Sequence, residues 1–223
     1  RKHPAFLFNL LDLLNAWETK LPRLSSEGAL YFRRSVGRAR DKQRVKQWHL
    51  KNHNQSNDNK EVDDTDTVTL FEGITLETSG VGIRGTPALS TLDDVTLNIL
   101  GTIVSGNRGI DFFNGVNAGG LSNTSLIVGE TGSIFGNAHG IILAGGYNNA
   151  VRNSGTICSK NDEAVVLEGG TNNIVENHGL ISSSNDRAVA IFGLATPGTL
   201  INTGTLTGIG GTTSTATVFM QGG

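Results

Sequence analysis

The chain has 223 residues, 30 of them glycine, and a formal net charge of −2. Its one cysteine, Cys158, excludes an intrachain disulfide and any metal site built from several thiolates. No apolar run approaches the roughly 18 residues that a membrane-spanning helix requires, so we expect no transmembrane segment.

Charge divides the chain near residue 60. The first sixty residues contain 13 of the 18 Lys and Arg but only 5 of the 20 Asp and Glu, which gives them a net charge of +8. The remainder is acidic and contains most of the glycine. We therefore predict two parts, a basic N-terminal segment with its linker (residues 1–60) and a repeat domain (residues 61–223).

The N-terminal segment is predicted to be partly helical. Apolar residues recur at helical spacing over residues 4–20 and Pro22 follows, so we expect an amphipathic helix there. Residues 29–51 are predicted to form a second, basic helix. Residues 52–66 are polar, which is typical of a linker.

The role of this basic segment stays open. It could bind anionic lipid or nucleic acid electrostatically, although no recognised nucleic-acid motif is present and we do not expect nucleic acid as the partner. It could equally be a leader ahead of the true domain, or helix 4–20 could cover the edge of the first coil. The apolar stretch 6–14 lacks a small-residue cleavage site, so we do not interpret it as a signal peptide, and an export signal could precede Arg1.

From about residue 67 the apolar pattern changes to a period of two. Residues 67–70 and 74–77 alternate apolar and polar side chains, as half-buried strands do. Short strands separated by Gly and Asn turns are expected from here to the end of the chain. The predicted class of this domain is therefore all-β.

Five similar phrases recur in this part of the chain, each centred on a glycine. Successive glycines are 31, 23, 24 and 25 residues apart. A period of about 24 residues, built from short strands, predicts a solenoid with three strands per turn, which is a parallel β-helix. The aligned glycines are Gly101, Gly132, Gly155, Gly179 and Gly204.

Stacking the repeats aligns large apolar residues in columns. We predict that these columns face the interior, because residues two apart on a strand share a face. A small residue precedes one strand of each repeat, where a tight corner leaves little room, and a weaker third strand supplies Val151 and residues 174–175. The predicted inward columns are Ile110, Ile141, Val165 and Val189; Phe112, Leu143, Leu167 and Ile191; and Ile103, Ile134, Ile157, Ile181 and Leu206.

Asparagine also recurs in register. Asn tolerates the left-handed backbone of a sharp corner, and stacked Asn side chains can hydrogen-bond from one coil to the next. We therefore predict two Asn ladders: Asn107, Asn137, Asn161 and Asn185 in one, and Asn153, Asn177 and Asn202 in the other.

Two further columns contain charged side chains. Carboxylates beside a basic group could form the site of a carbohydrate lyase or hydrolase. Because the acids are few, lie in different columns and lack an aromatic platform, we favour surface ion pairs and predict no catalytic residue. The aligned columns are Gly109, His139, Glu163 and Arg187, and Arg152, Glu176 and Ile201.

The candidate metal ligands and nucleophiles match no recognised metal-binding or catalytic motif. The acidic clusters 63–66 and 93–94 could supply oxygens to Ca²⁺, but neither matches the EF-hand or the calcium-binding nonapeptide pattern. His49 and His53 lack the Glu of the zincin motif. Cys158 is expected to pack rather than react. We therefore predict no metal ion and no cofactor.

The repeated phrases resemble those of bacterial autotransporter passenger domains. They are Asn-Ser-Gly-Thr-Ile-Cys-Ser at 153–159, Asn-His-Gly-Leu-Ile-Ser-Ser at 177–183 and Asn-Thr-Gly-Thr-Leu-Thr-Gly at 202–208, with Ala-Val-Val-Leu-Glu-Gly-Gly-Thr-Asn-Asn at 164–173. They are also similar to repeats ahead of calcium-binding nonapeptide arrays in large secreted bacterial proteins. The resemblance spans about residues 67–223 and implies a right-handed parallel β-helix outside a Gram-negative cell, often adhesive. It carries over no catalytic residue.

We therefore predict a non-catalytic adhesion or interaction module, secreted or displayed on the outer-membrane surface. Its expected partner is an extracellular carbohydrate or a host or cell-surface protein, bound through strand faces and the longer loop around 114–125. It is expected to be a monomer or a fragment of a larger chain. The alternative is a polysaccharide lyase or glycoside hydrolase on a pectate-lyase-like β-helix, and a third hypothesis is a stalk that presents another domain.

Overall fold

The computed structural model describes residues 60–85, 92–112, 121–192, 198–209 and 217–221, together with the backbone of 44–48. Every helix or strand in these ranges is a β-strand, which confirms the all-β class. The predicted helix 4–20 lies outside the described residues. Where residues 29–51 are described, the helix prediction is wrong, because residues 44–48 pair in parallel with a neighbouring strand and extend a sheet.

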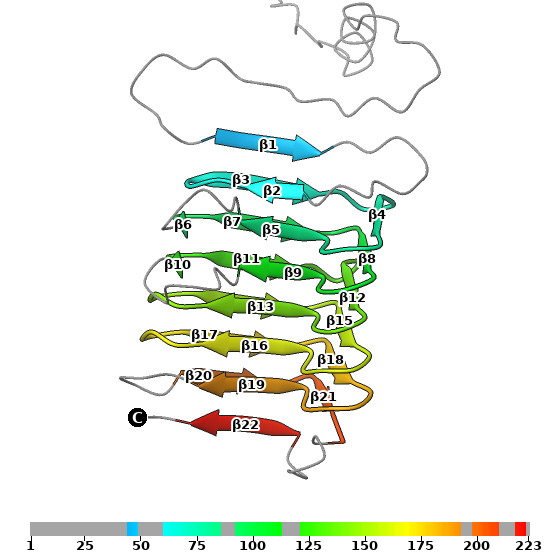
Figure 1. Ribbon diagram of the computed structural model, residues 1–223, viewed down its shortest axis with the longest axis vertical. Coiled ribbons are helices and arrows are strands. Elements are labelled where there is room, and N and C mark those ends of the chain that lie inside the picture. Colours follow the sequence, from blue (N-terminus) through cyan, green and yellow to red (C-terminus); the bar gives the residue numbers. More distant parts are fainter. Residues whose placement is uncertain are drawn as a thin grey trace, which may run out of the picture.

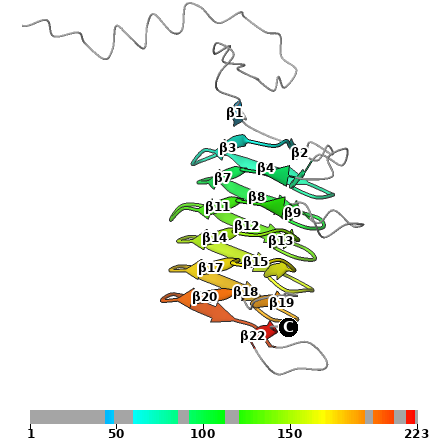
Figure 2. The ribbon, with the colours of Figure 1, turned by 90° about the vertical axis from the view of Figure 1, so that its left-hand side faces the viewer.

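Three parallel sheets wrap the chain into a β-solenoid, as the repeats predicted (Figures 1 and 2). Sheet 1 contains β1 (Arg44–Trp48), β3 (Asp66–Leu70), β7 (Thr96–Ile99), β11 (Ser125–Val128), β14 (Ala150–Asn153), β17 (Ile174–Asn177) and β20 (Thr199–Asn202). Sheet 2 contains β4 (Thr75–Thr78), β8 (Thr102–Ser105), β12 (Ser133–Gly136), β15 (Thr156–Ser159), β18 (Leu180–Ser183) and β21 (Thr205–Thr207). Sheet 3 contains β2 (Lys60–Val62), β5 (Ile83–Gly85), β9 (Ile110–Phe112), β13 (Ile141–Ala144), β16 (Val165–Glu168), β19 (Val189–Phe192) and β22 (Val218–Gln221). A short pair, β6 (Leu92–Asp93) and β10 (Leu121–Ser122), stacks at the return from sheet 3 to sheet 1.

The chain visits sheets 1, 2 and 3 in turn, and each strand pairs with its counterpart one coil away. From β14 onward the order is strictly repeated, with β14, β15 and β16 followed by β17, β18 and β19. Each coil therefore satisfies the backbone groups of the next. The last residues of the predicted linker 52–66 already belong to this array, because β2 and the start of β3 fall within them.

The interior is a stack of aliphatic columns in the predicted register. In sheet 2, Ile134 pairs with Ile103 and Ile157, and Ile157 pairs with Ile181, and all four side chains are fully buried. Leu206, in the last coil, is partly buried. Both predicted columns of sheet 3 are also buried and in register.

Three strands of sheet 3, β13, β16 and β19, are buried on both faces, which the sequence columns had not indicated. Ile142, Val166 and Ala190 alternate with the inward residues and therefore point away from the interior, yet they are at most 5% exposed. The strands accordingly contain three consecutive apolar residues, such as Val165–Leu167. Such uninterrupted runs are typical of strands buried on both sides.

One predicted Asn ladder is continuous and internal. Asn153 Nδ2 donates to Asn177 Oδ1 at 2.7 Å, and Asn177 Nδ2 donates to Asn202 Oδ1 at 2.7 Å. Asn153 and Asn177 are fully buried, and each also donates to backbone carbonyls at the corner between sheets 1 and 2. The ladder thus closes this corner and links three coils.

The second predicted Asn column lies at the exposed corner between sheets 2 and 3. Asn161 Nδ2 donates to the Asn137 carbonyl at 2.8 Å, and Asn185 Nδ2 donates to Asn161 Oδ1 at 3.4 Å. Asn107 lies one residue nearer to its following strand than the other three and does not share their position.

The left-handed backbone that we predicted for these two columns occurs at the third corner instead. Asn123, Asn148 and Asn172 have φ values of 56°, 60° and 57° between sheets 3 and 1. Their side chains also stack, with Asn148 Nδ2 donating to Asn123 Oδ1 at 3.1 Å. In two of these coils a pair of glycines of positive φ comes shortly before the Asn, Gly145 and Gly146 before Asn148 and Gly169 and Gly170 before Asn172.

Candidate functional site

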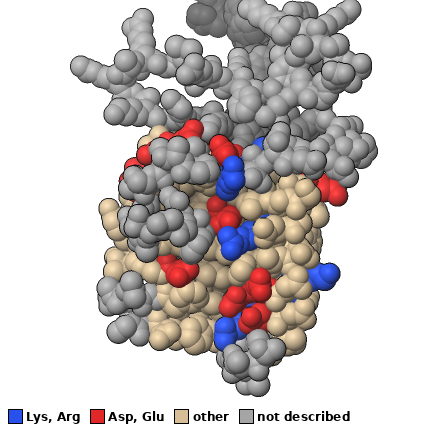
Figure 3. All heavy atoms as spheres, viewed as in Figure 1, with Lys and Arg blue, Asp and Glu red and all other residues tan. Residues whose placement is uncertain are grey.

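A row of charged side chains runs along the corner between sheets 2 and 3. Each member precedes the small residue that leads into a strand of sheet 3, and backbone bonds stack the coils here, with Gly109 N donating to the His139 carbonyl at 3.0 Å and Ala164 N to the Arg187 carbonyl at 3.2 Å. In Figure 3, acidic and basic groups alternate down the face that sheet 3 presents. We call this row the charge ladder; its members are Arg108, His139, Glu163 and Arg187.

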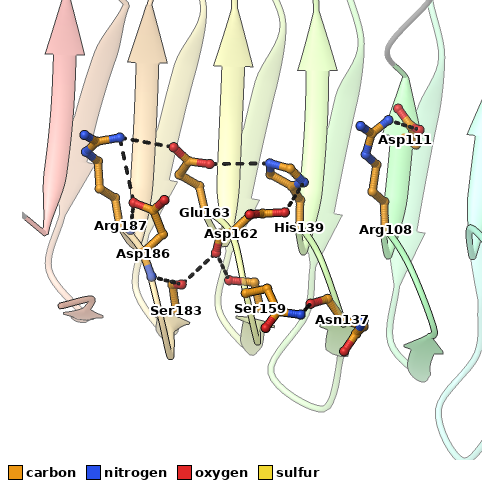
Figure 4. Close-up of polar contacts among 11 residues, drawn as sticks. Arg108, Asp111, Asn137, His139, Ser159, Asp162, Glu163, Ser183, Asp186 and Arg187 are labelled. Atoms are coloured by element: carbon orange, nitrogen blue, oxygen red, sulfur yellow. Dashed lines mark hydrogen bonds and ion pairs between the residues drawn. The ribbon is translucent and has the colours of Figure 1, made fainter. Parts of the chain in front are cut away.

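Arg108 occupies the place that the sequence alignment gave to Gly109. The alignment counted forward from the Asn column, and Asn107 is one residue closer to its strand than Asn137 or Asn161. Counting back from the strands would have found Arg108. In the structure, Arg108 Nη1 pairs with Asp111 Oδ2 of its own coil at 2.7 Å (Figure 4).

Glu163 lies at the centre of the ladder and contacts a basic group on each side (Figure 4). Its Oε1 is 3.2 Å from Arg187 Nη1, and its Oε2 is 3.4 Å from His139 Nε2. The other ring nitrogen of His139, Nδ1, is 3.7 Å from Asp162 Oδ2. The three ladder side chains are each 17% exposed, so these contacts are only partly screened by water.

This environment lowers the pKa of Glu163. The hydrogen bond from His139 is the main cause, a backbone hydrogen bond and the charges of His139 and Arg187 add to it, and partial burial opposes it. The carboxylate is therefore stabilised in its ionised form, which favours an ion-pair role for Glu163.

Serine side chains fix the backbone beneath the ladder. Ser159 Oγ and Ser183 Oγ both donate to the Asp162 carbonyl at 2.6 Å, so one acceptor joins two coils. Ser105 Oγ donates to the Arg108 carbonyl at 2.7 Å in the same way. These serines are nearly fully buried, and the row of charges therefore stands on a fixed support.

We expect the free energy of unfolding of the E163Q variant to depend less on pH in the acid range than that of the wild type. Because the folded pKa of Glu163 is below its ordinary value of 4.5, its contribution is present above that pH and is lost as the pH falls through the folded pKa. Urea unfolding of both proteins at pH values from neutral down to about 3 would measure this. The wild type should lose more of its free energy of unfolding below pH 4.5 than E163Q; parallel acid limbs would contradict the assignment.

The second predicted charge column is confirmed on the outer face of sheet 1. Arg152 pairs in register with Glu176, and Arg152 Nε is 3.3 Å from Glu176 Oε2. His178 extends the group, with Nε2 2.9 Å from Glu176 Oε1 and Nδ1 2.6 Å from Thr203 Oγ1. The His178 hydrogen bond is the main cause of a lowered pKa at Glu176. Arg152 and His178 are each 46% exposed, so this is a solvated surface network.

Two carboxylates of the acidic cluster 63–66 accept backbone hydrogen bonds, one within its own turn and one from the neighbouring coil. Asp63 N donates to Asp66 Oδ2 at 2.7 Å, and Asp93 N donates to Asp64 Oδ1 at 3.0 Å. Among the described residues, no group of three or more His, Cys, Asp and Glu could hold a metal ion. His49 and His53 lie outside the described residues, as does most of the predicted loop 114–125.

The outer face of sheet 2 is uncharged along β8 to β21. Its two outward columns were not recognised from the sequence, although they occupy every position that alternates with the inward isoleucines. The first column contains Thr102, Ser133, Thr156, Leu180 and Thr205, and the second contains Val104, Phe135, Cys158, Ser182 and Thr207. We call these ten residues the uncharged face.

The uncharged face has an exposed apolar centre. Phe135 is 41% exposed and pairs in register with Val104, which is 38% exposed, and with Cys158 on its other side. Partial burial raises the pKa of the Cys158 thiol, which favours the unreactive protonated form. Cys158 follows the buried Ile157 in β15 and lies on the outward face of the strand, where it is partly buried.

No helix among the described residues is long and apolar enough to cross a membrane. Comparison of the chain with protein-family models, with curated proteins and with solved structures finds no match. The geometry of the charge ladder and of the uncharged face is therefore the basis on which a function can be argued.

Proposed function

We propose that this protein is a non-catalytic interaction or adhesion module, secreted or displayed on the surface of a Gram-negative cell. The proposal combines the β-solenoid with the resemblance of its repeats to autotransporter passenger domains. We further infer that the solenoid is right-handed, since crossovers between parallel strands are right-handed in about 98% of cases. Its partner would be an extracellular carbohydrate or a cell-surface protein.

The observation that best supports a binding role is that the carboxylate of Glu163 in the charge ladder is held in ion pairs. Both oxygens of Glu163 contact basic groups, and its pKa is lowered. A general acid at neutral pH needs the opposite shift, because it must hold its proton until the transition state. The lowered pKa therefore argues against Glu163 as the general acid of a glycoside hydrolase and favours a structural ion-pair row.

The solenoid also suits a binding mode made of many weak contacts. Strands of successive coils repeat at about 4.8 Å, so one outward column presents similar groups at regular intervals. Affinity would then accumulate over several coils, with no dependence on a single residue. This distinguishes an adhesive face from a stalk, which would contribute length alone.

Binding and turnover can be separated in one experiment. The purified chain is incubated with soluble polygalacturonate, and ultraviolet absorbance reports any unsaturated product. In parallel, its retention on immobilised polysaccharides and on surface-protein fractions is measured. Retention without product is the expected result; steady product formation that E163Q abolishes would favour the lyase.

A coil deletion tests adhesion against the stalk hypothesis. Removing residues 155–178 takes out β15, β16 and β17 and joins Ser154 to Gly179, which occupies the place of Gly155 in the next coil. The shortened solenoid should keep its β-sheet circular dichroism. We expect weaker retention than that of the full chain; unchanged retention would favour a stalk.

A further inference from the structure

We propose that the uncharged face binds a neutral polysaccharide, with Phe135 as the central contact. This inference rests on the proposed function and adds to it the binding face and the class of ligand. The other two sheets provide the contrast on which the argument depends.

Charge distinguishes the uncharged face from its neighbours. The outward residues of sheet 1 include Arg152 and Glu176, and those of sheet 3 include Arg84 and Asp111. Between β8 and β21, sheet 2 presents no charged side chain along its strands. An anionic chain such as a polyuronate would lose hydration here without gaining a counter-charge, whereas a neutral sugar would not.

The apolar centre matches the C–H face of a sugar ring. Phe135 and Val104 are neighbours in register, and both have more than a third of their surface exposed. Aromatic side chains contribute much of the contact energy at binding surfaces because they bury a large rigid area.

A row of hydroxyl groups runs beside this apolar centre. Thr102, Ser133 and Thr156 occupy three successive coils in register. A hydroxyl both donates and accepts hydrogen bonds, as does each hydroxyl of a sugar. A polymer lying along the solenoid axis over β8, β12 and β15 would therefore meet a hydroxyl group beside Val104, Phe135 or Cys158 at each of these coils, which repeat at about 4.8 Å.

Cys158 provides a reporter on this face. It is the one cysteine of the chain and lies in register between Phe135 and Ser182. The rate of its alkylation by a maleimide is measured at fixed pH, alone and with a soluble β-glucan, a galactomannan, a dextran or polygalacturonate. We expect at least one neutral polysaccharide to slow the reaction and polygalacturonate to leave it unchanged.

Substitutions then test the central contact. F135A should weaken binding of the protecting polysaccharide about tenfold, the loss expected for an aromatic anchor. The matched control is I127A, because Ile127 is also outward-facing and is 37% exposed, but on sheet 1. Its affinity should stay within about twofold of wild type, a difference of roughly 0.4 kcal/mol.

The possible results separate this inference from the proposed function. Retention on a neutral polysaccharide without protection of Cys158 would keep the adhesive role and overturn this face. Equal protection by polygalacturonate would overturn the neutral class. Self-association that F135A abolishes, with no polysaccharide bound, would replace the ligand by a second copy. Absence of retention on every polysaccharide and surface-protein fraction would overturn both proposals.

Discussion

The I181D variant is expected to lose its cooperative unfolding transition, or to have its free energy of unfolding lowered by about 4 kcal/mol or more. Ile181 is fully buried in β18 and lies in register between Ile157 and Leu206. A carboxylate at this position would have aliphatic neighbours within its column, so it would be desolvated without a compensating partner. Because each coil is stabilised by its neighbours, the damage would extend to adjacent coils.

The S182D variant is the matched control for this prediction. Ser182 is the next residue of the same strand, but it lies on the uncharged face, where a carboxylate stays in water. Its free energy of unfolding should lie within about 0.5 kcal/mol of wild type. Urea unfolding followed by circular dichroism measures both variants, and similar losses in the two would contradict the inward–outward alternation.

The solenoid could be predicted from the sequence because the same pattern of apolar, glycine and asparagine residues recurs in each coil. An inward position such as Ile157 has equivalents in several coils, so an accidental match in one repeat is corrected by the others. The same reasoning located the Asn153–Asn177 ladder. A single short strand has no such redundancy, and residues 44–48 were assigned to a helix because their pairing with β3 is a tertiary contact.

The candidate site was predicted less completely, for two physical reasons. Corners vary in length from coil to coil, so alignment through Asn107 displaced the charge ladder by one residue and missed Arg108. The uncharged face was missed because the columns aligned in the sequence were those of large apolar residues, and these residues face inward. Its signal is the absence of charge at alternating positions such as Val104 and Phe135, which becomes visible only once the register is known.

The burial of β13, β16 and β19 on both faces was missed for a similar reason. Three consecutive apolar residues in β13, β16 and β19 indicate burial on both faces. Ile142 and Val166 therefore indicate burial on both faces already in the sequence. They were missed because the predicted columns contain only residues two apart on each strand. A search for runs without alternation would have found it.

The repeated glycines that revealed the fold are required because the backbone of the neighbouring coil leaves no space for a side chain, and the G179A variant is expected to be destabilised. A Cβ at Gly179 would lie 2.1 Å from the Gly155 carbonyl oxygen and 2.7 Å from the Ser154 carbonyl carbon. Both are backbone atoms of the preceding coil, so relief of the clash would require the coils to separate at this corner. We expect the free energy of unfolding to fall by about 1–3 kcal/mol, the range for overpacking a well-packed site.

The control for this substitution is G85A. A Cβ at Gly85 would lie 3.1 Å from Leu92 Cδ2 and 3.8 Å from Phe112 Cδ1, which are side-chain atoms that can rotate away. Both variants add one methyl group, and they differ in whether backbone or side chain must yield. Urea unfolding should therefore show a clearly larger loss for G179A. Equal losses would contradict this explanation. They would mean that close contact between the coils is not what requires glycine at this position.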